Sequence, residues 1–166
     1  MSEPPDARPA TAADATALAA LERDANLLAL ADVFPADEHP FPTGGVEDRW
    51  RRVLADPAVT VEVVDGSEGD LLAFVAYDEQ VLRHLAVHPS RWRHGWGRAL
   101  VERAVARMGP RPRLWCLVEN AGARALYEQL GWAPTGREQP AEWPPYPAEI
   151  EYVRNEPDRP LTASEE

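Results

Sequence analysis

The stretch VHPSRWRHGWGRAL, residues 87–100, decides the fold, because it predicts the end of a strand, a tight turn and the start of a helix. Gly95 and Gly97 let backbone amides approach a ligand closely, since no Cβ stands in the way. The start of the helix adds unpaired N–H groups and the positive end of a dipole. Together these features predict a cradle for an anion such as a pyrophosphate.

Other phosphate-binding loops do not fit this stretch. A Walker loop needs G-x-x-x-x-G-K-[ST], which the sequence does not contain. The dinucleotide fingerprint needs a third glycine, and Leu100 occupies that position. The alternative is a tight strand-to-helix turn that binds nothing, so a second feature has to decide between the two.

That second feature is LWCLVENAGARALYEQLGW, residues 114–132, which predicts a buried strand followed by a helix. Asn120 can cap the helix, and Ala123, Leu126, Tyr127 and Leu130 recur at the spacing of one helical face. Taken alone, Tyr127 is equally well explained as a core tyrosine whose hydroxyl finds a partner.

The remaining patterns predict one domain over residues 1–156 and a polar tail over 157–166. The predicted order is β-α-α-β-β-β-α-β-α-β-β, with an antiparallel meander followed by a local parallel crossover. The predicted helices span residues 11–32, 46–55, 95–108 and 120–130. The predicted strands span residues 7–10, 59–64, 71–77, 81–87, 113–118, 132–136 and 148–154.

Charge is distributed unevenly along the 166 residues, which carry a net charge of −11. Between residues 83 and 113 eight arginines face a single acid, Glu102, so this segment is +7 and the remainder −18. The arginines are either solvated on one helix or form a site for a compact anion. The acidic remainder argues against nucleic acid or anionic lipid as a partner.

Two further observations bear on the compartment. The sequence has no run of about 20 apolar residues, the length that a membrane-spanning helix needs. Its single cysteine, Cys116, cannot form an internal disulfide, so a reducing cytoplasm is expected.

The two segments together resemble the GNAT superfamily of acetyl-CoA-dependent N-acyltransferases. The phosphate loop of that family reads Q/R-x-x-G-x-G/A after a strand ending in V-x-P, and residues 85–89 and 92–97 match it. The later family motif N-x-x-A-x-x-F/L-Y-x-x-x-G-F matches residues 120–132, with Trp132 in the last place. The resemblance covers roughly residues 7–154. Trp92 departs from it, because it stands where Gln or Arg is usual; Arg91 or Arg93 would then supply the missing charge.

The resemblance implies an α+β fold in three layers (α/β/α), with a mixed, mostly antiparallel sheet of about six to seven strands and a splayed central pair. It implies an N-acetyltransferase that moves an acetyl group from acetyl-CoA to an amine acceptor by direct attack, with no metal, as a monomer or homodimer. A catalytically silent acyl-CoA-binding or sensor module is the alternative, and a nucleotide or nucleic-acid binder is a third.

Residue by residue, the resemblance implies a donor site in which the strand at 85–87 pairs with the pantetheine arm. The amides of 93–98 hold the pyrophosphate, Asn120 binds the arm, and Tyr127 faces the sulfur and protonates it. The residues expected to bind the coenzyme are Leu85, Ala86, Val87, Arg93, His94, Gly95, Trp96, Gly97, Arg98, Asn120, Arg124 and Tyr127.

The reaction also needs a neutral amine. An alkyl amine of pKa about 10.4 is neutral in only about one molecule in 2,500 at pH 7, a penalty near 4.6 kcal/mol. Glu79, His84 and Glu119 are the candidate bases, and catalysis through water stays open. Strict alternation along residues 81–87 would place Leu82, His84 and Ala86 on one face of the strand.

For the acceptor pocket, the resemblance implies walls from the loops at 34–43 and 139–147. The residues expected to contact the acceptor are Glu38, His39, Phe41, Trp143 and Tyr146. These loops are aromatic, acidic and stiffened by proline, so we expect a cationic or amine-bearing acceptor with some apolar bulk. Ordinary solvated acids on proline-rich loops are the alternative explanation.

Overall fold

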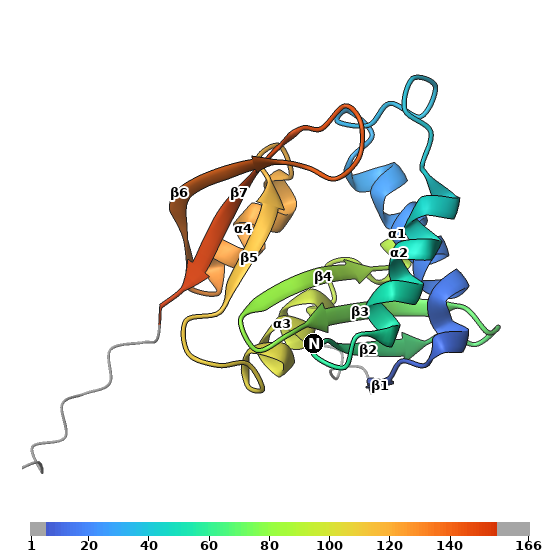
Figure 1. Ribbon diagram of the computed structural model, residues 1–166, viewed down its shortest axis with the longest axis horizontal. Helices are drawn as coiled ribbons and strands as arrows, with labels where there is room; N and C mark the ends of the chain where they lie inside the picture. The colour runs from blue at the N-terminus through green and yellow to red at the C-terminus, as the bar shows by residue number, and fades with distance from the viewer. Residues whose placement is uncertain (1–5, 156–166) are drawn as a thin grey trace, which may run out of the picture.

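The computed structural model describes residues 6–155, which form one open mixed sheet flanked by helices (Figure 1). The seven strands lie in the order β1-β2-β3-β4-β5-β7-β6. The expected α+β class is confirmed, whereas the expected polar tail at 157–166 lies outside the described residues. The helices are α1 (Ala15–Ala29), α2 (Thr43–Ala55), α3 (Trp96–Val105) and α4 (Ala121–Gln129). The strands are β1 (Arg8–Pro9), β2 (Thr60–Asp65), β3 (Leu71–Tyr77), β4 (Val81–Val87), β5 (Arg113–Leu117), β6 (Trp132–Pro140) and β7 (Ala148–Arg154).

The sheet has a hydrophobic core on each face, which gives the three layers. On one face α1 and α2 pack on β2 and β3, with Trp50 fully buried and its ring 4.9 Å from that of Phe74. On the other face α3 and α4 pack on the sheet, with Leu100 and Val101 against Val75. Burying a side chain of this size stabilises the fold by roughly 1.5–3 kcal/mol. Within residues 6–155 no helix has the length and apolar character needed to cross a bilayer.

The chain enters α1 through a 3-10 turn at Ala12–Asp14, close to the expected helix start at residue 11. The backbone N–H of Thr11 donates to the Asp14 carboxylate (2.7 Å), and Arg8 of β1 pairs with the same carboxylate at 2.9 Å. The hydrogen bonds from Arg8 lower the pKa of Asp14, against the opposing effect of burial. The helix ends at Ala29, three residues earlier than expected, because the chain then folds into turns in which Val33 and Phe34 donate to the Leu30 carbonyl.

The two central strands, β4 and β5, are parallel and separate after a short contact. They pair only at Val81↔Arg113 and Leu82↔Leu114, and Figure 1 shows them diverging beyond that point. β4 nevertheless stays paired with β3 as far as Val87. His88 N–H donates to the Leu72 carbonyl on the β3 side, so the backbone groups of Val87 point toward the gap. The expected splayed pair is confirmed, and it leaves one edge of β4 open.

A β-bulge changes the expected alternation along β4. Tyr77 pairs with Leu82 and Ala76 with His84, so Arg83 is an extra residue on β4. Leu82 therefore lies in the same core as Leu85 and Val87, and the prediction that it shares a face with His84 and Ala86 was wrong. The alternation of apolar and polar side chains along a strand cannot reveal an inserted residue when both faces of the strand are partly apolar.

Candidate functional site

A cavity of about 800 Å³ opens where β4 and β5 diverge. Its walls come from α1, the α1–α2 loop, α2, β4, β5, the start of α4 and the β6–β7 loop. Of the residues expected in the site, the cavity is lined by His84, Leu85, Ala86, Asn120, Tyr127, Glu38, His39, Phe41 and Trp143. Residues from segments far apart in sequence therefore meet around one space, as ligand sites require.

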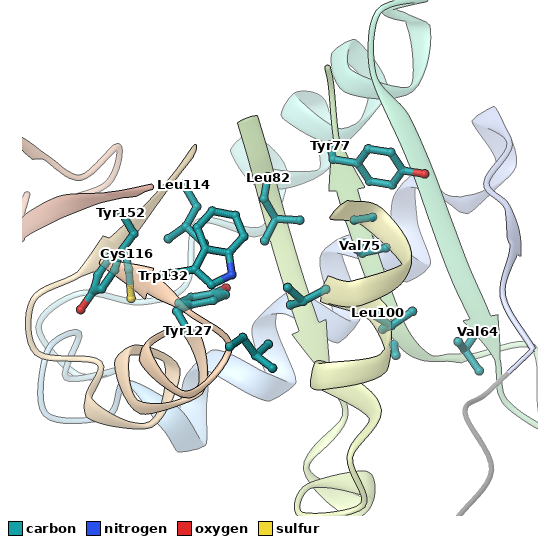
Figure 2. Close-up of a cluster of buried hydrophobic side chains, with 14 residues drawn as sticks. Val64, Val75, Tyr77, Leu82, Leu100, Leu114, Cys116, Tyr127, Trp132 and Tyr152 are labelled. Carbon is teal, nitrogen blue, oxygen red and sulfur yellow. The ribbon is translucent and has the colours of Figure 1, made fainter. Parts of the chain in front are cut away.

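Tyr127 reaches this cavity from α4. Asn120 caps that helix by accepting a hydrogen bond from the Ala123 N–H (3.2 Å). The Tyr127 ring lies 6.0 Å from that of Trp132, and Figure 2 shows the two rings side by side near Cys116 and Leu114 of β5. Tyr127 is 8% exposed, and within the described part of the chain its hydroxyl makes no hydrogen bond. Burial, with a smaller effect of Cys116, raises the pKa of Tyr127, so the phenol is neutral.

The loop between β4 and α3 has the backbone that the glycines predict. Arg93 and Gly95 have positive φ angles of 65° and 78°, and α3 begins at Trp96. Gly95 is needed for its angle, because a Cβ there would meet no atom within 4 Å but would be strained. Gly97 serves packing instead, since its Cβ would lie 3.4 Å from Leu126 of α4. The first amides of α3 are left without helical partners.

Trp92 makes a hydrogen bond to the end of β4 that the sequence did not predict. Its indole Nε1–H donates to the Val87 carbonyl oxygen at 2.7 Å, which ties the loop to the end of β4. Arg91 lies over the Trp96 ring, 5.7 Å from its centroid. The Val87 carbonyl, expected to be open to a pantetheine arm, is therefore already occupied.

The arginines of residues 83–113 divide into two groups. Arg83 pairs with Asp78 at 2.8 Å, Arg113 with Glu151 at 3.8 Å, and both Arg103 and Arg107 with the buried Glu62. Within residues 6–155, four of the eight make no ion pair with a carboxylate: Arg91, Arg93, Arg98 and Arg111. Three of these four flank the glycine loop, so uncompensated positive charge is concentrated there.

Eleven expected site residues do not line the cavity. Seven of them, Val87 and residues 93–98, belong to the end of β4 and the glycine loop. The other four are Glu79, Glu119, Arg124 and Tyr146. Glu79 lines a separate depression of about 370 Å³ at the start of β4. Glu119 is exposed, and Tyr146 is 57% exposed. Arg124 instead holds α4 in place, because it donates to the Tyr152 hydroxyl (2.9 Å) and to the Val118 carbonyl (3.1 Å).

His84 lies in the cavity but is a poor base. Its ring packs 5.2 Å from that of Trp50. Burial, together with the nearby cations Arg49 and Arg83, lowers the pKa of His84 to about 3. A neutral imidazole that resists protonation can accept a hydrogen bond but takes up a proton only weakly.

Several polar residues that line the cavity were not predicted from the sequence. Arg49 of α2 donates from Nη2 to both carboxylate oxygens of Glu22 of α1 (2.6 and 2.8 Å), and its Nη1 donates to Glu142 of the β6–β7 loop at 3.3 Å. Burial raises the pKa of Glu22, although Arg49 opposes this effect. Glu149 of β7 also lines the cavity. Glu22 lies four residues after Leu18, on the buried face of α1. An acid on this otherwise apolar face was the sequence feature that could have predicted its place in the cavity.

The β6–β7 loop closes the end of the cavity that lies next to α2. Trp143 of this loop lies against Gly45 of α2, where a Cβ would come within 2.7 Å of the indole ring. The packing of Trp143 on Gly45 and the ion pair between Glu142 and Arg49 hold the loop against α2. Figure 1 shows this loop approaching the segment between α1 and α2. Within the described residues no group of three His, Cys, Asp or Glu side chains could hold a metal ion.

Solved structures with the same architecture are acetyltransferases. A GCN5-related N-acetyltransferase from Rhodopseudomonas palustris aligns with a TM-score of 0.73 at 16% identity, over 94% of this chain and 98% of its own. PaiA N-acetyltransferase from Thermoplasma acidophilum, solved with coenzyme A, aligns at 0.68 and 12% identity, over 91% and 98%. A chimera of the spermidine N-acetyltransferase SpeG from Vibrio cholerae and hSSAT aligns at 0.63 and 19% identity, over 90% and 94%. At these identities the likeness establishes the fold.

The family itself is established by sequence. The profile of the Acetyltransferase (GNAT) family matches residues 26–132, which is more than half of the chain. The chain therefore belongs to the GNAT family of acetyltransferases. A search of curated proteins gave no match.

Proposed function

We propose that this chain is an N-acetyltransferase that transfers an acetyl group from acetyl-CoA to a cationic amine. The observation that carries the proposal is Tyr127, a buried side chain that lines the cavity between β4 and β5 and whose hydroxyl makes no hydrogen bond within residues 6–155. A sulfur bound in the gap would give this hydroxyl its partner.

The donor half of the site has groups that suit coenzyme A. The open edge of β4 offers the N–H groups of Leu85 and Val87 to a pantetheine arm, and Asn120 lines the same space. The glycine loop, with its unpaired helical amides and the nearby Arg91, Arg93 and Arg98, suits the pyrophosphate. Trp92 occupies the Val87 carbonyl, so the arm would be held there by donors rather than by both backbone groups. Arg124 acts on α4 rather than on the ligand.

The chemistry follows from the ionisation of these groups. A leaving thiolate, with a thiol pKa near 8.5, is improved by protonation, and the neutral Tyr127 phenol is able to donate that proton. The carbonyl oxygen gains negative charge during attack, and a main-chain N–H near Val87 is the donor that would stabilise it. Holding amine and thioester together supplies the largest remaining contribution.

The acceptor half of the site is acidic and aromatic. Glu38, His39, Phe41 and Trp143 line it, and Glu22, Glu142 and Glu149 add carboxylates close to the cation Arg49. The other arginine of the cavity, Arg83, is paired with Asp78. Carboxylates and aromatic faces favour a substituted ammonium group. The solved neighbour described as a spermidine N-acetyltransferase, a protein acting on a cationic amine, supports this choice. The free Cys116 is consistent with our placing the reaction in the cytoplasm.

The test is thiol release from acetyl-CoA with a panel of amines. We expect turnover with diamines and with arylalkylamines, and none with amines that carry a carboxylate. Coenzyme A binding without turnover on any amine would favour the silent acyl-CoA-binding module instead.

A further inference from the structure

Glu149 is placed on the cavity wall by the pairing of β7 with β5. It lies opposite Leu117 in the antiparallel ladder, and Val118 N–H donates to the Ala148 carbonyl at 3.0 Å. The neighbouring Ile150 and Tyr152 belong to the core on the α4 face of the sheet. Because successive side chains on a strand point to opposite faces, Glu149 points away from α4 and faces the cavity that it lines.

The Glu149 carboxylate has no cationic partner within residues 6–155. Its recorded contact is a hydrogen bond from the Gln139 amide of β6, at 2.5 Å. Two of the other acids of the cavity differ, since Glu22 and Glu142 both contact Arg49. Glu149 is half-buried, and the neutral amide of Gln139 holds its carboxylate in position.

The charged groups around Glu149 come from several elements. Burial and the negative charge of Glu142 raise the pKa of Glu149, whereas the hydrogen bond from Gln139 lowers it. Glu22 from α1, Arg49 from α2, Glu38 and His39 from the α1–α2 loop, His84 from β4 and Cys116 from β5 line the same cavity.

Four of these neighbours, His84, Cys116, Glu22 and Glu142, are less suited to accept a proton. His84 resists protonation, and burial raises the pKa of Cys116 to about 12, which keeps the thiol neutral. Glu22 is bound to Arg49 through both carboxylate oxygens, and Glu142 is largely exposed.

Glu149 of β7, Cys116 of β5 and Tyr127 of α4 line the same cavity. The cavity therefore has a carboxylate on the β7 side and a neutral, unpartnered phenol on the α4 side. Two titratable groups in one cavity, one ionised and one neutral, are the arrangement that separates a base from an acid.

We propose that Glu149 is the base that takes the proton from the acceptor ammonium, an inference that rests on the proposed acetyl transfer. The ammonium N–H bond breaks and its proton joins the Glu149 carboxylate. The freed lone pair forms the N–C bond to the acetyl carbonyl. The C–S bond then breaks with its electron pair on sulfur, which receives the Tyr127 proton. The second proton on nitrogen restores the Tyr127 phenol, and Glu149 releases its proton to solvent, so one proton is released per turnover.

The test compares Glu149→Gln with the control Glu138→Gln, which changes an exposed acid of β6 that does not line the cavity. Thiol release is measured against pH for two acceptors, an alkyl amine and an alkoxyamine that is already neutral at pH 7. We expect Glu149→Gln to lower kcat/KM for the alkyl amine by about 10²–10³-fold at pH 7. The loss should shrink as the pH approaches the pKa of the amine, and it should nearly vanish for the alkoxyamine. Glu138→Gln should match the wild type for both acceptors.

Several results would overturn this proposal. An equal loss for both acceptors, or a loss independent of pH, would assign Glu149 a structural role. A loss of less than twofold with the alkyl amine, or the same pH-dependent loss in Glu79→Gln or Glu119→Gln, would also refute it. Glu149→Asp, which keeps a carboxylate, should retain more activity than Glu149→Gln; equal activities would count against a base. A wild-type protein that binds coenzyme A yet acetylates no amine would refute the proposed function, whereas these variant results refute only the role of Glu149.

Discussion

Replacing Tyr127 with phenylalanine removes one hydroxyl from the cavity and leaves the ring in place. An average hydrogen bond contributes about 1 kcal/mol, and this hydroxyl makes none within the described residues. The ring contact with Trp132, at 6.0 Å, survives the substitution. We therefore expect the free energy of unfolding to change by less than about 0.5 kcal/mol.

The effect on the reaction should be much larger. A positioned acid contributes about 10²–10⁴ in rate, and a thiolate of thiol pKa near 8.5 leaves fairly well unaided, so the lower end applies. We expect kcat to fall about 100-fold, equivalent to about 2.7 kcal/mol. Thiol release at saturating acetyl-CoA measures kcat, and calorimetry measures the Kd for coenzyme A, which should stay within twofold.

The matched control is Tyr77→Phe, because Tyr77 is also a buried tyrosine but lines the separate depression at the start of β4. It should keep wild-type kcat. Since burial raises the pKa of Tyr127, the phenol stays protonated and should produce no alkaline limb in the rate profile below pH 10. Wild-type kcat in Tyr127→Phe would refute the role of Tyr127 as the acid.

Other substitutions test the surrounding structure. Gly45→Ala places a Cβ 2.7 Å from the Trp143 ring, so the KM for the acceptor should rise several-fold. Gly44→Ala is the control, because its Cβ meets open space and should only raise the free energy of unfolding, by about 0.5 kcal/mol. Equal kinetics in the two variants would contradict a role for the Trp143 contact in acceptor binding. Gly95→Ala, at φ 78°, should cost about 1–2 kcal/mol, seen as a lower Tm or a weaker Kd for coenzyme A, and no change in either would show that the angle is unimportant. Because the pKa of His84 is lowered to about 3, the unfolded chain binds a proton first as the pH falls below about 6.5, so stability should fall there. Urea unfolding at pH 7 and pH 5 should show a smaller difference for His84→Gln than for the wild type, and equal differences would contradict the shift.

Features encoded over a few neighbouring residues were predicted well. The strands at 71–77, 81–87 and 148–154 have the expected bounds, since each has enough apolar or β-branched residues between clear turn signals. The tight turn before α3, in which Gly95 has a positive φ, and the cap at Asn120 likewise depend on short motifs. The bulge at Arg83 was missed because the strand is partly apolar on both faces, so its sequence shows no clear alternation that an extra residue would break.

The acceptor half of the cavity depends on contacts between distant residues. Arg49 meets Glu22 across 27 positions and Glu142 across 93, and neither spacing follows a local period. Glu79 was chosen because it lies close to β4 in sequence, but it is at the end of the strand away from the opening. Glu149 was missed for the converse reason, since only the pairing of β7 with β5 brings it to the cavity.

A crystal structure of the protein with coenzyme A tests the central claim most directly. We expect the pantetheine arm to lie along the open edge of β4, the pyrophosphate to contact the amides of residues 93–98, and the thiol sulfur to lie within hydrogen-bonding distance of the Tyr127 hydroxyl. Coenzyme A bound elsewhere, or bound in the gap with its sulfur remote from Tyr127, would contradict the account.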